Sequence, residues 1–60
     1  MTFNLKTWRR LRGLTQQEMA DKMGVSRQIY IRYEKNPENV RYGRIKQIAE
    51  ILEIEVGDIR

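Results

Sequence analysis

The most informative chemistry in this 60-residue sequence lies on three side chains that share one side of a predicted helix. With a rotation of about 100° per residue, Gln28, Ile29 and Arg32 fall within about 100° of one another. Tyr30 and Glu34 fall on the opposite side, so packing of Tyr30 into the protein would turn the first three toward solvent. In the major groove of DNA, glutamine can bond adenine, arginine can bond guanine and isoleucine can contact the thymine methyl group. We therefore expect a base-reading face here, although the same side chains could form an ordinary solvated helix face.

Basic and amide side chains around this face could hold the phosphate backbone. Arg27 begins the same helix and can reach forward, so it joins the residues expected to contact bases. Gln16 and Gln17 open the preceding predicted helix, whose N-terminal N–H groups and partial positive charge favour phosphate. Further phosphate contacts are expected from the basic residues that follow the base-reading helix: Lys35, Arg41, Arg44 and Lys46. The alternative is that these charges serve only solubility.

Two short helices must position this face, and both have clear start and stop signals. Thr15 followed by Glu18 is a capping box, in which each side chain satisfies a backbone N–H at the helix start. Gly24 can adopt the positive φ that ends this helix, and Ser26 is a good N-cap for the next. The pair, at about residues 15–35, predicts a helix-turn-helix whose helices cross nearly at right angles.

Three further helices complete the predicted core. Asn4 is a good N-cap for a first helix that ends near Arg12. A fourth helix is expected at residues 42–52. Its apolar residues have the spacing i, i+3, i+4, i+7: Ile45, Ile48, Ala49 and Leu52. A short fifth helix at residues 56–59 would close the core, so we expect one compact all-α domain of five helices that spans residues 1–60.

The composition argues against several classes of function. The chain has no cysteine and no histidine, which removes disulfides, thiolate metal sites and the commonest general base. It contains no nucleophile–base pair, metal-ligand cluster or phosphate-binding glycine loop, so we expect no enzyme, metal, cofactor or small-molecule ligand. No apolar run approaches the roughly 18 residues of a membrane span, and there is no apolar core of a signal peptide. The expected location is the cytoplasm, at the nucleoid.

The charge of the chain is unevenly distributed. Twelve basic and eight acidic residues give a net charge of +4. Residues 1–46 hold eleven basic and four acidic residues, a net charge of +7, whereas residues 47–60 hold one basic and four acidic residues, a net charge of −3. A basic front and an acidic end suit a polyanion bound on one side only.

The central part of the chain resembles a known family. The stretch from Gly13 to Arg27, GLTQQEMADKMGVSR, looks like the lambda-repressor-like or Cro-type helix-turn-helix family, as do Arg9 and Arg12 before it. Further similarities lie in the residues after this stretch: Arg32, Tyr33, Glu34, Ile45, Ile48, Ala49, Leu52, Val56 and Ile59. The resemblance implies a five-helix fold whose third helix enters the major groove. It also implies a transcriptional regulator of bacteria or their phages, often a dimer on paired half-sites.

The resemblance also assigns roles to individual residues. The glutamine that matches Gln16 contacts phosphate in the family, and the residues that match Arg27, Gln28 and Arg32 commonly reach base edges. The family further pairs an arginine at Arg9 with a glutamate on the third helix, here Glu34. That ion pair would tie the first helix to the end of the third.

Several positions depart from the family pattern. Tyr30 replaces a common aliphatic residue, and Ile29 and Ile31 replace small polar ones. Glu53 stands where a glycine usually ends the fourth helix, and a left-handed conformation there would cost roughly 1 kcal/mol.

The combined prediction is sequence-specific binding of double-stranded DNA by a repressor or Cro-like regulator, complete or as part of a longer repressor or antitoxin. The alternative is a protein-interaction module, or an antitoxin-type domain that binds a partner, with the same fold; the two isoleucines on the base-reading helix favour it. A homodimer is also open. Ile51, Ile54 and Ile59 either complete the core or form an apolar patch near the acidic end.

Overall fold

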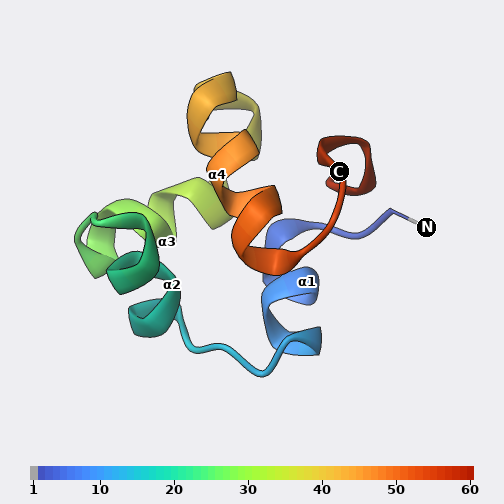
Figure 1. Ribbon diagram of the computed structural model, residues 1–60. Coiled ribbons are helices and arrows are strands. Elements are labelled where there is room, and N and C mark those ends of the chain that lie inside the picture. The colour runs from blue at the N-terminus through green and yellow to red at the C-terminus, as the bar shows by residue number, and fades with distance from the viewer. Residues whose placement is uncertain (1) are drawn as a thin grey trace.

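The computed structural model describes residues 2–60 and contains four α-helices. They are α1 (Leu5–Leu11), α2 (Gln16–Met23), α3 (Arg27–Lys35) and α4 (Tyr42–Leu52), shown in Figure 1. Two 3-10 turns, η1 (Pro37–Asn39) and η2 (Val56–Asp58), precede and follow α4. The all-α class and the first four predicted helices are confirmed.

The expected fifth α-helix is a single three-residue 3-10 turn, so the five-helix count is not confirmed. The reason lies in the backbone hydrogen bonds at the end of the chain. The amide of Phe3 donates to the carbonyl of Asp58 at 3.1 Å, and the amide of Arg60 donates to the carbonyl of Phe3 at 2.9 Å. Ile59 is extended and forms an isolated parallel bridge with Phe3. Backbone groups that another helical turn would use are thus paired with the N-terminal segment.

The three predicted N-caps are present. Asn4, Thr15 and Ser26 each accept a hydrogen bond from the backbone amide three residues further on, at 2.9, 3.0 and 3.1 Å. Glu18 completes the capping box by accepting from the amide of Thr15 at 2.8 Å. Gly24 ends α2 with a φ of 73°, in the left-handed region that glycine adopts without a steric penalty. The starts of α1, α2 and α3 are therefore determined by short-range contacts.

The core lies where the four helices meet. Its largest fully buried side chains come from every helix: Leu5, Met19, Tyr30, Ile48 and Leu52. Ala20 is also fully buried, which lets α3 pack closely on α2. The apolar residues near the acidic end, Ile51, Ile54 and Ile59, pack partly buried against this core. Of the two expectations for these isoleucines, completion of the core agrees with the structure.

None of the helices among residues 2–60 combines the length and apolar content needed to cross a bilayer.

Candidate nucleic-acid interface

The outer face of α3 presents the side chains that the helical rotation predicted. Tyr30 is 0% exposed, which confirms its predicted place in the core. Gln28 and Arg32 are exposed, and Ile29 is 38% exposed. Ile31 is half-buried at the flank of the helix. An amide, a guanidinium and an aliphatic side chain thus stand together on a convex helical surface, which a DNA major groove can accommodate.

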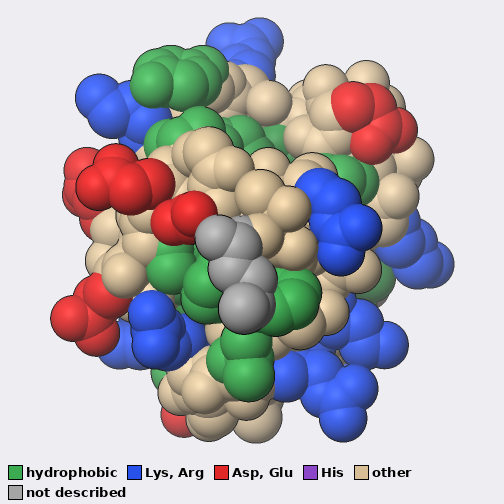
Figure 2. Space-filling model, turned by 90° about the vertical axis from the view of Figure 1, so that its right-hand side faces the viewer, with side chains coloured by type: hydrophobic (Ala, Val, Ile, Leu, Met, Phe, Trp, Pro, Cys, Tyr) green, Lys and Arg blue, Asp and Glu red, His purple; other side chains and the backbone are tan. Residues whose placement is uncertain are grey.

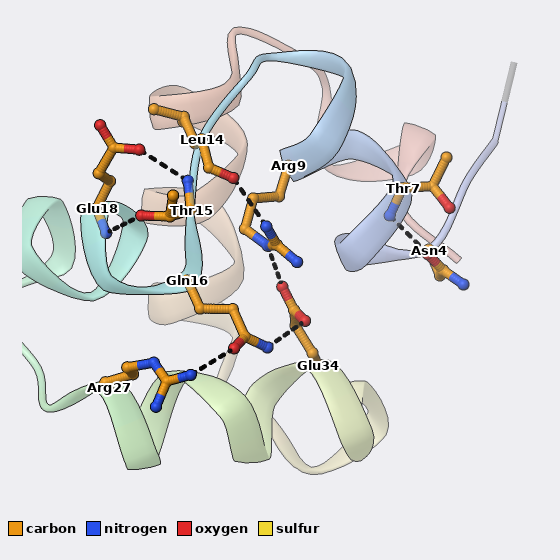
Figure 3. Close-up of polar contacts among 9 residues, drawn as sticks. All are labelled: Asn4, Thr7, Arg9, Leu14, Thr15, Gln16, Glu18, Arg27 and Glu34. Atoms are coloured by element: carbon orange, nitrogen blue, oxygen red, sulfur yellow. Dashed lines mark hydrogen bonds and ion pairs between the residues drawn. The ribbon is translucent and has the colours of Figure 1, made fainter.

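The C-terminal end of α3 is joined to α1 by a buried ion pair. The Nε atom of Arg9 lies 2.6 Å from Oε2 of Glu34, and the two side chains are only 10% and 7% exposed. The same guanidinium donates through Nη1 to the carbonyl oxygen of Leu14 at 2.8 Å. Arg9 therefore joins the end of α1, the loop before α2 and the last part of α3 (Figure 3).

Hydrogen bonds continue from this ion pair toward the surface. Gln16 donates through Nε2 to Oε1 of Glu34 at 3.1 Å, and its Oε1 atom accepts from Nη2 of Arg27 at 3.5 Å. Figure 3 shows the Gln16 amide between Glu34 and Arg27. Gln16, expected to contact phosphate, is thus half-buried and bonded within the protein on both sides.

The surroundings of Glu34 keep it charged. Burial alone would raise its pKa, but the hydrogen bonds from Arg9 and Gln16 outweigh burial and lower the pKa of Glu34 below its ordinary value. The neighbouring Tyr30 hydroxyl is buried and has no hydrogen-bond partner among residues 2–60. Burial, with the negative charge of Glu34, raises the pKa of Tyr30 well above its ordinary value. Tyr30 is therefore neutral at physiological pH.

A shallow hollow of about 430 Å³ lies beside this chain of contacts, between the end of α1 and the starts of α2 and α3. Its polar walls include Arg10, Gln16, Gln17 and Arg27, and no carboxylate lines it. Sequence reasoning missed Arg10, because nothing in its spacing distinguishes it from a solvated charge.

The other residues expected to contact phosphate differ in their surroundings. Gln17, Lys35 and Arg41 are exposed, and the Gln17 amide donates to the Asp21 carboxylate at 2.9 Å. Arg44 is half-buried. Its guanidinium donates to the last carbonyl of α2, on Met23, at 3.3 Å. That contact leaves only part of the Arg44 guanidinium for a ligand.

Two sets of hydrogen bonds between segments far apart in the sequence were not predicted from the sequence. Gln47 on α4 donates to the Met23 carbonyl at 3.3 Å and accepts from Arg44 at 2.9 Å, so the two residues cap α2 together. Arg12 donates through Nε to the Leu52 carbonyl at 2.7 Å and so caps the end of α4. Basic residues near a helix C-terminus are a known signal, but here the capping residues come from other helices.

The comparison with protein families agrees with this architecture. The family model described as "Helix-turn-helix" matches residues 5–59. The chain belongs to the Cro/C1-type helix-turn-helix family. Helices α2 and α3 lie at the residues, about 15–35, where the sequence predicts the motif.

Two curated helix-turn-helix proteins are similar to the chain. The "Uncharacterized HTH-type transcriptional regulator YqaE" of Bacillus subtilis is 40% identical over 53 residues, which cover 88% of this chain and 46% of that protein. The "Uncharacterized HTH-type transcriptional regulator MJ0272" of Methanocaldococcus jannaschii is 37% identical over 59 residues, which cover 98% of this chain and 89% of that protein. The chain therefore spans less than half of one relative and most of the other. No solved structure matches the chain significantly.

Proposed function

We propose that this domain binds double-stranded DNA with sequence specificity and regulates transcription, with α3 in the major groove. The observation that carries the proposal is the complete burial of Tyr30, which leaves Gln28 and Arg32 exposed on the opposite side of α3. The names of both relatives, as transcriptional regulators of helix-turn-helix type, support it.

Three side chains on α3 would read bases. Gln28 can form two hydrogen bonds with adenine, and Arg32 can form two with guanine. Ile29 would lie against the methyl group of thymine, which explains an exposed isoleucine on a helix that is otherwise polar on this side. Arg27, predicted with them, stands apart because its guanidinium faces Gln16 at the start of α2.

The phosphate backbone would be held from both sides of α3. Gln16 and Gln17 lie at the start of α2, and Lys35 ends α3. Gln16 would offer only the part of its amide that its bonds to Glu34 and Arg27 leave unused. Arg41 precedes α4, and Arg44 would add the donors that its contact with Met23 leaves unused. These contacts set the orientation of the domain on the duplex but carry little sequence information.

Among regulators of transcription, the domain would act as a repressor or Cro-like regulator of a bacterium or phage, in the cytoplasm at the nucleoid. Two copies bound to paired half-sites would place their α3 helices about 34 Å apart, one turn of DNA. Sedimentation of the protein with and without a selected duplex measures whether one or two copies bind.

Selection of binding sites from a random pool of duplex DNA tests the proposal. We expect a recovered consensus that includes a guanine contacted by Arg32. Arg32→Ala should relax preference at that position, at a cost of roughly 1–3 kcal/mol of binding free energy. Binding through about six phosphates should weaken about a thousandfold between roughly 50 and 200 mM salt. Weak binding to every duplex, with little dependence on salt, would reject the proposal.

The second candidate function is the binding of another protein, either as a protein-interaction module or as an antitoxin-type domain that binds a partner. Its specific support is the exposure of Leu11, at 60%, and of Ile29, at 38%. Ile29→Ala separates the two functions. On the DNA-binding proposal, it weakens only sites that carry thymine at one position, and replacement of that thymine by uracil has the same effect.

A further inference from the structure

Arg27 differs from the other exposed side chains of α3 in the direction of its guanidinium. Its Nη2 atom lies 3.5 Å from Oε1 of Gln16, and the side chain lines the hollow between α1, α2 and α3. Gln28 and Arg32 do not line this hollow. The first residue of α3 is therefore turned toward α2, away from the face that Gln28 and Arg32 share.

The orientation of the Gln16 amide explains this direction. Its NH2 group must face Glu34, because the opposite orientation would place the amide oxygen against a carboxylate and the NH2 group against a guanidinium. The amide oxygen consequently faces Arg27. Glu34 is itself held by Arg9, so contacts run without a break from the buried ion pair to the surface guanidinium (Figure 3).

The charge of the hollow is complementary to an anion. Arg9 is neutralised by Glu34, but Arg10 and Arg27 have no carboxylate within ion-pair distance in the part of the chain that the structure describes. The two arginines come from different helices, α1 and α3, and both line the hollow. Arginine is well suited to phosphate, because its planar group can donate two parallel hydrogen bonds.

We infer that Arg27, together with Arg10, clamps one backbone phosphate of the bound DNA and does not read a base. Gln16 and Glu34 are positioning residues, which act by holding the Arg27 guanidinium over the hollow. This inference rests on the proposed DNA binding. It deepens that function by dividing the exposed residues of α3 into a phosphate anchor, Arg27, and base readers, Gln28 and Arg32.

Arg27→Ala tests the division. Binding is measured to the selected duplex and to its complete set of single-base variants over a range of salt concentrations. We expect all sequences to weaken by a similar factor, and the slope of log affinity against log salt to shrink by about 0.9, the value of one phosphate contact. Loss of preference at one base position, with the salt slope unchanged, would overturn the inference.

Single methylphosphonate substitutions, which remove the charge of one phosphate, sharpen the test. A methylphosphonate at the clamped phosphate should weaken binding by the parent protein. It should weaken binding by Arg27→Ala by a clearly smaller factor, because only Arg10 still contacts that phosphate in this variant. Arg60→Ala is the matched control, since it removes an exposed arginine from the acidic end of the chain. If no phosphate shows this pattern, the clamp does not exist.

A double-mutant cycle tests the positioning role of Gln16. Arg27→Ala should weaken binding by a clearly smaller factor in a Gln16→Ala background than in the parent, because Arg27 is no longer held. Equal factors in the two backgrounds would show that Gln16 does not position Arg27.

The source of the anion is settled by NMR titration of the side-chain signals of Arg27 and Gln16. We expect the selected duplex to shift them at concentrations where inorganic phosphate does not. A saturable shift with phosphate alone, and none with DNA, would overturn the clamp in favour of a free anion. Absence of any selected duplex for the parent would reject the proposed function itself, which is a separate result.

Discussion

The α2–α3 unit and the junction of the two chain ends are built by different kinds of contact. In the α2–α3 unit, Thr15 and Ser26 cap the helices through amides three residues away, and Gly24 makes the turn. At the junction, the indole of Trp8 donates to the Asp58 carbonyl, 50 residues away, at 2.7 Å. Figure 1 shows the two ends side by side, away from α2 and α3. The candidate binding face is thus specified locally, whereas the ends are closed by long-range contacts.

The surface around the ends also differs from the candidate interface. Figure 2 views the side on which the chain ends lie, where acidic and basic side chains both surround separate areas of hydrophobic ones. The hollow beside Arg27, by contrast, has arginines and no carboxylate in its walls. A mixed surface gives little attraction to a polyanion, so the comparison supports binding by the α2–α3 side.

The largest effect is expected at the ion pair between Arg9 and Glu34, which joins α1, the helix that also carries Trp8, to α3. Glu34→Ala leaves the Arg9 guanidinium buried without its counter-charge, which should lower the free energy of unfolding by about 3 kcal/mol. Urea denaturation followed by circular dichroism measures the loss. Glu50→Ala, which removes an exposed carboxylate from α4, is the control and should change stability by about 0.5 kcal/mol or less. Similar losses in both variants would mean that the ion pair stabilises the fold no more than an exposed carboxylate does.

The same carboxylate predicts a dependence of stability on pH. Its pKa in the folded state is below the ordinary value of 4.5, so its contribution is complete above that pH and is lost as the pH falls through the folded pKa. Glu34→Gln should therefore flatten the acid limb of a stability–pH curve. Part of the limb should remain, because the backbone hydrogen bond from Thr15 also lowers the pKa of Glu18. An unchanged limb would contradict the assignment to Glu34.

Trp8→Phe changes a contact at the junction of the chain ends and none in the α2–α3 unit. It removes the hydrogen bond to the Asp58 carbonyl while keeping an aromatic ring against Phe3, and should cost about 1–2 kcal/mol of stability. Under conditions where the variant stays folded, its affinity for a selected duplex should equal that of the parent. A loss of affinity without a loss of folding would show that the two regions are not separate.

Tyr30→Phe tests the buried side of α3 separately from its outer face. The buried hydroxyl has no partner among residues 2–60, so its removal should raise the free energy of unfolding by about 1 kcal/mol and leave the outer face of α3 unchanged. Thermal unfolding measures the gain. A less stable variant would show that the hydroxyl donates a hydrogen bond, for which the neighbouring Glu34 carboxylate is the candidate acceptor.

The smallest effect is expected at Glu53, where α4 ends. This residue has a φ of 59°, the only positive φ on a non-glycine residue between residues 2 and 60. Glu53→Gly should relieve the strain and raise stability by about 0.5–1 kcal/mol. Glu50→Gly, inside α4, should instead lower stability by about 1 kcal/mol. The same sign for both variants would exclude relief of strain as the cause.

The sequence alone determined the positions of the four α-helices and the exposed face of α3. The helix positions depend on short-range features, namely the caps and the glycine turn. The exposed face of α3 depends on the helical rotation, which places Tyr30 and Gln28 on opposite sides. The ion pair of Arg9 and Glu34 was expected only through resemblance to a family.

Tertiary structure decided what spacing cannot encode. The direction of Arg27 depends on Gln16, on another helix, and the last turn depends on pairing with Phe3 at the other end of the chain. Arg12 and Arg44 resemble other surface charges in the sequence, but carbonyl groups at the ends of α4 and α2 hold them in place. Such choices follow from which polar groups meet after the helices pack, because buried donors and acceptors must then find partners.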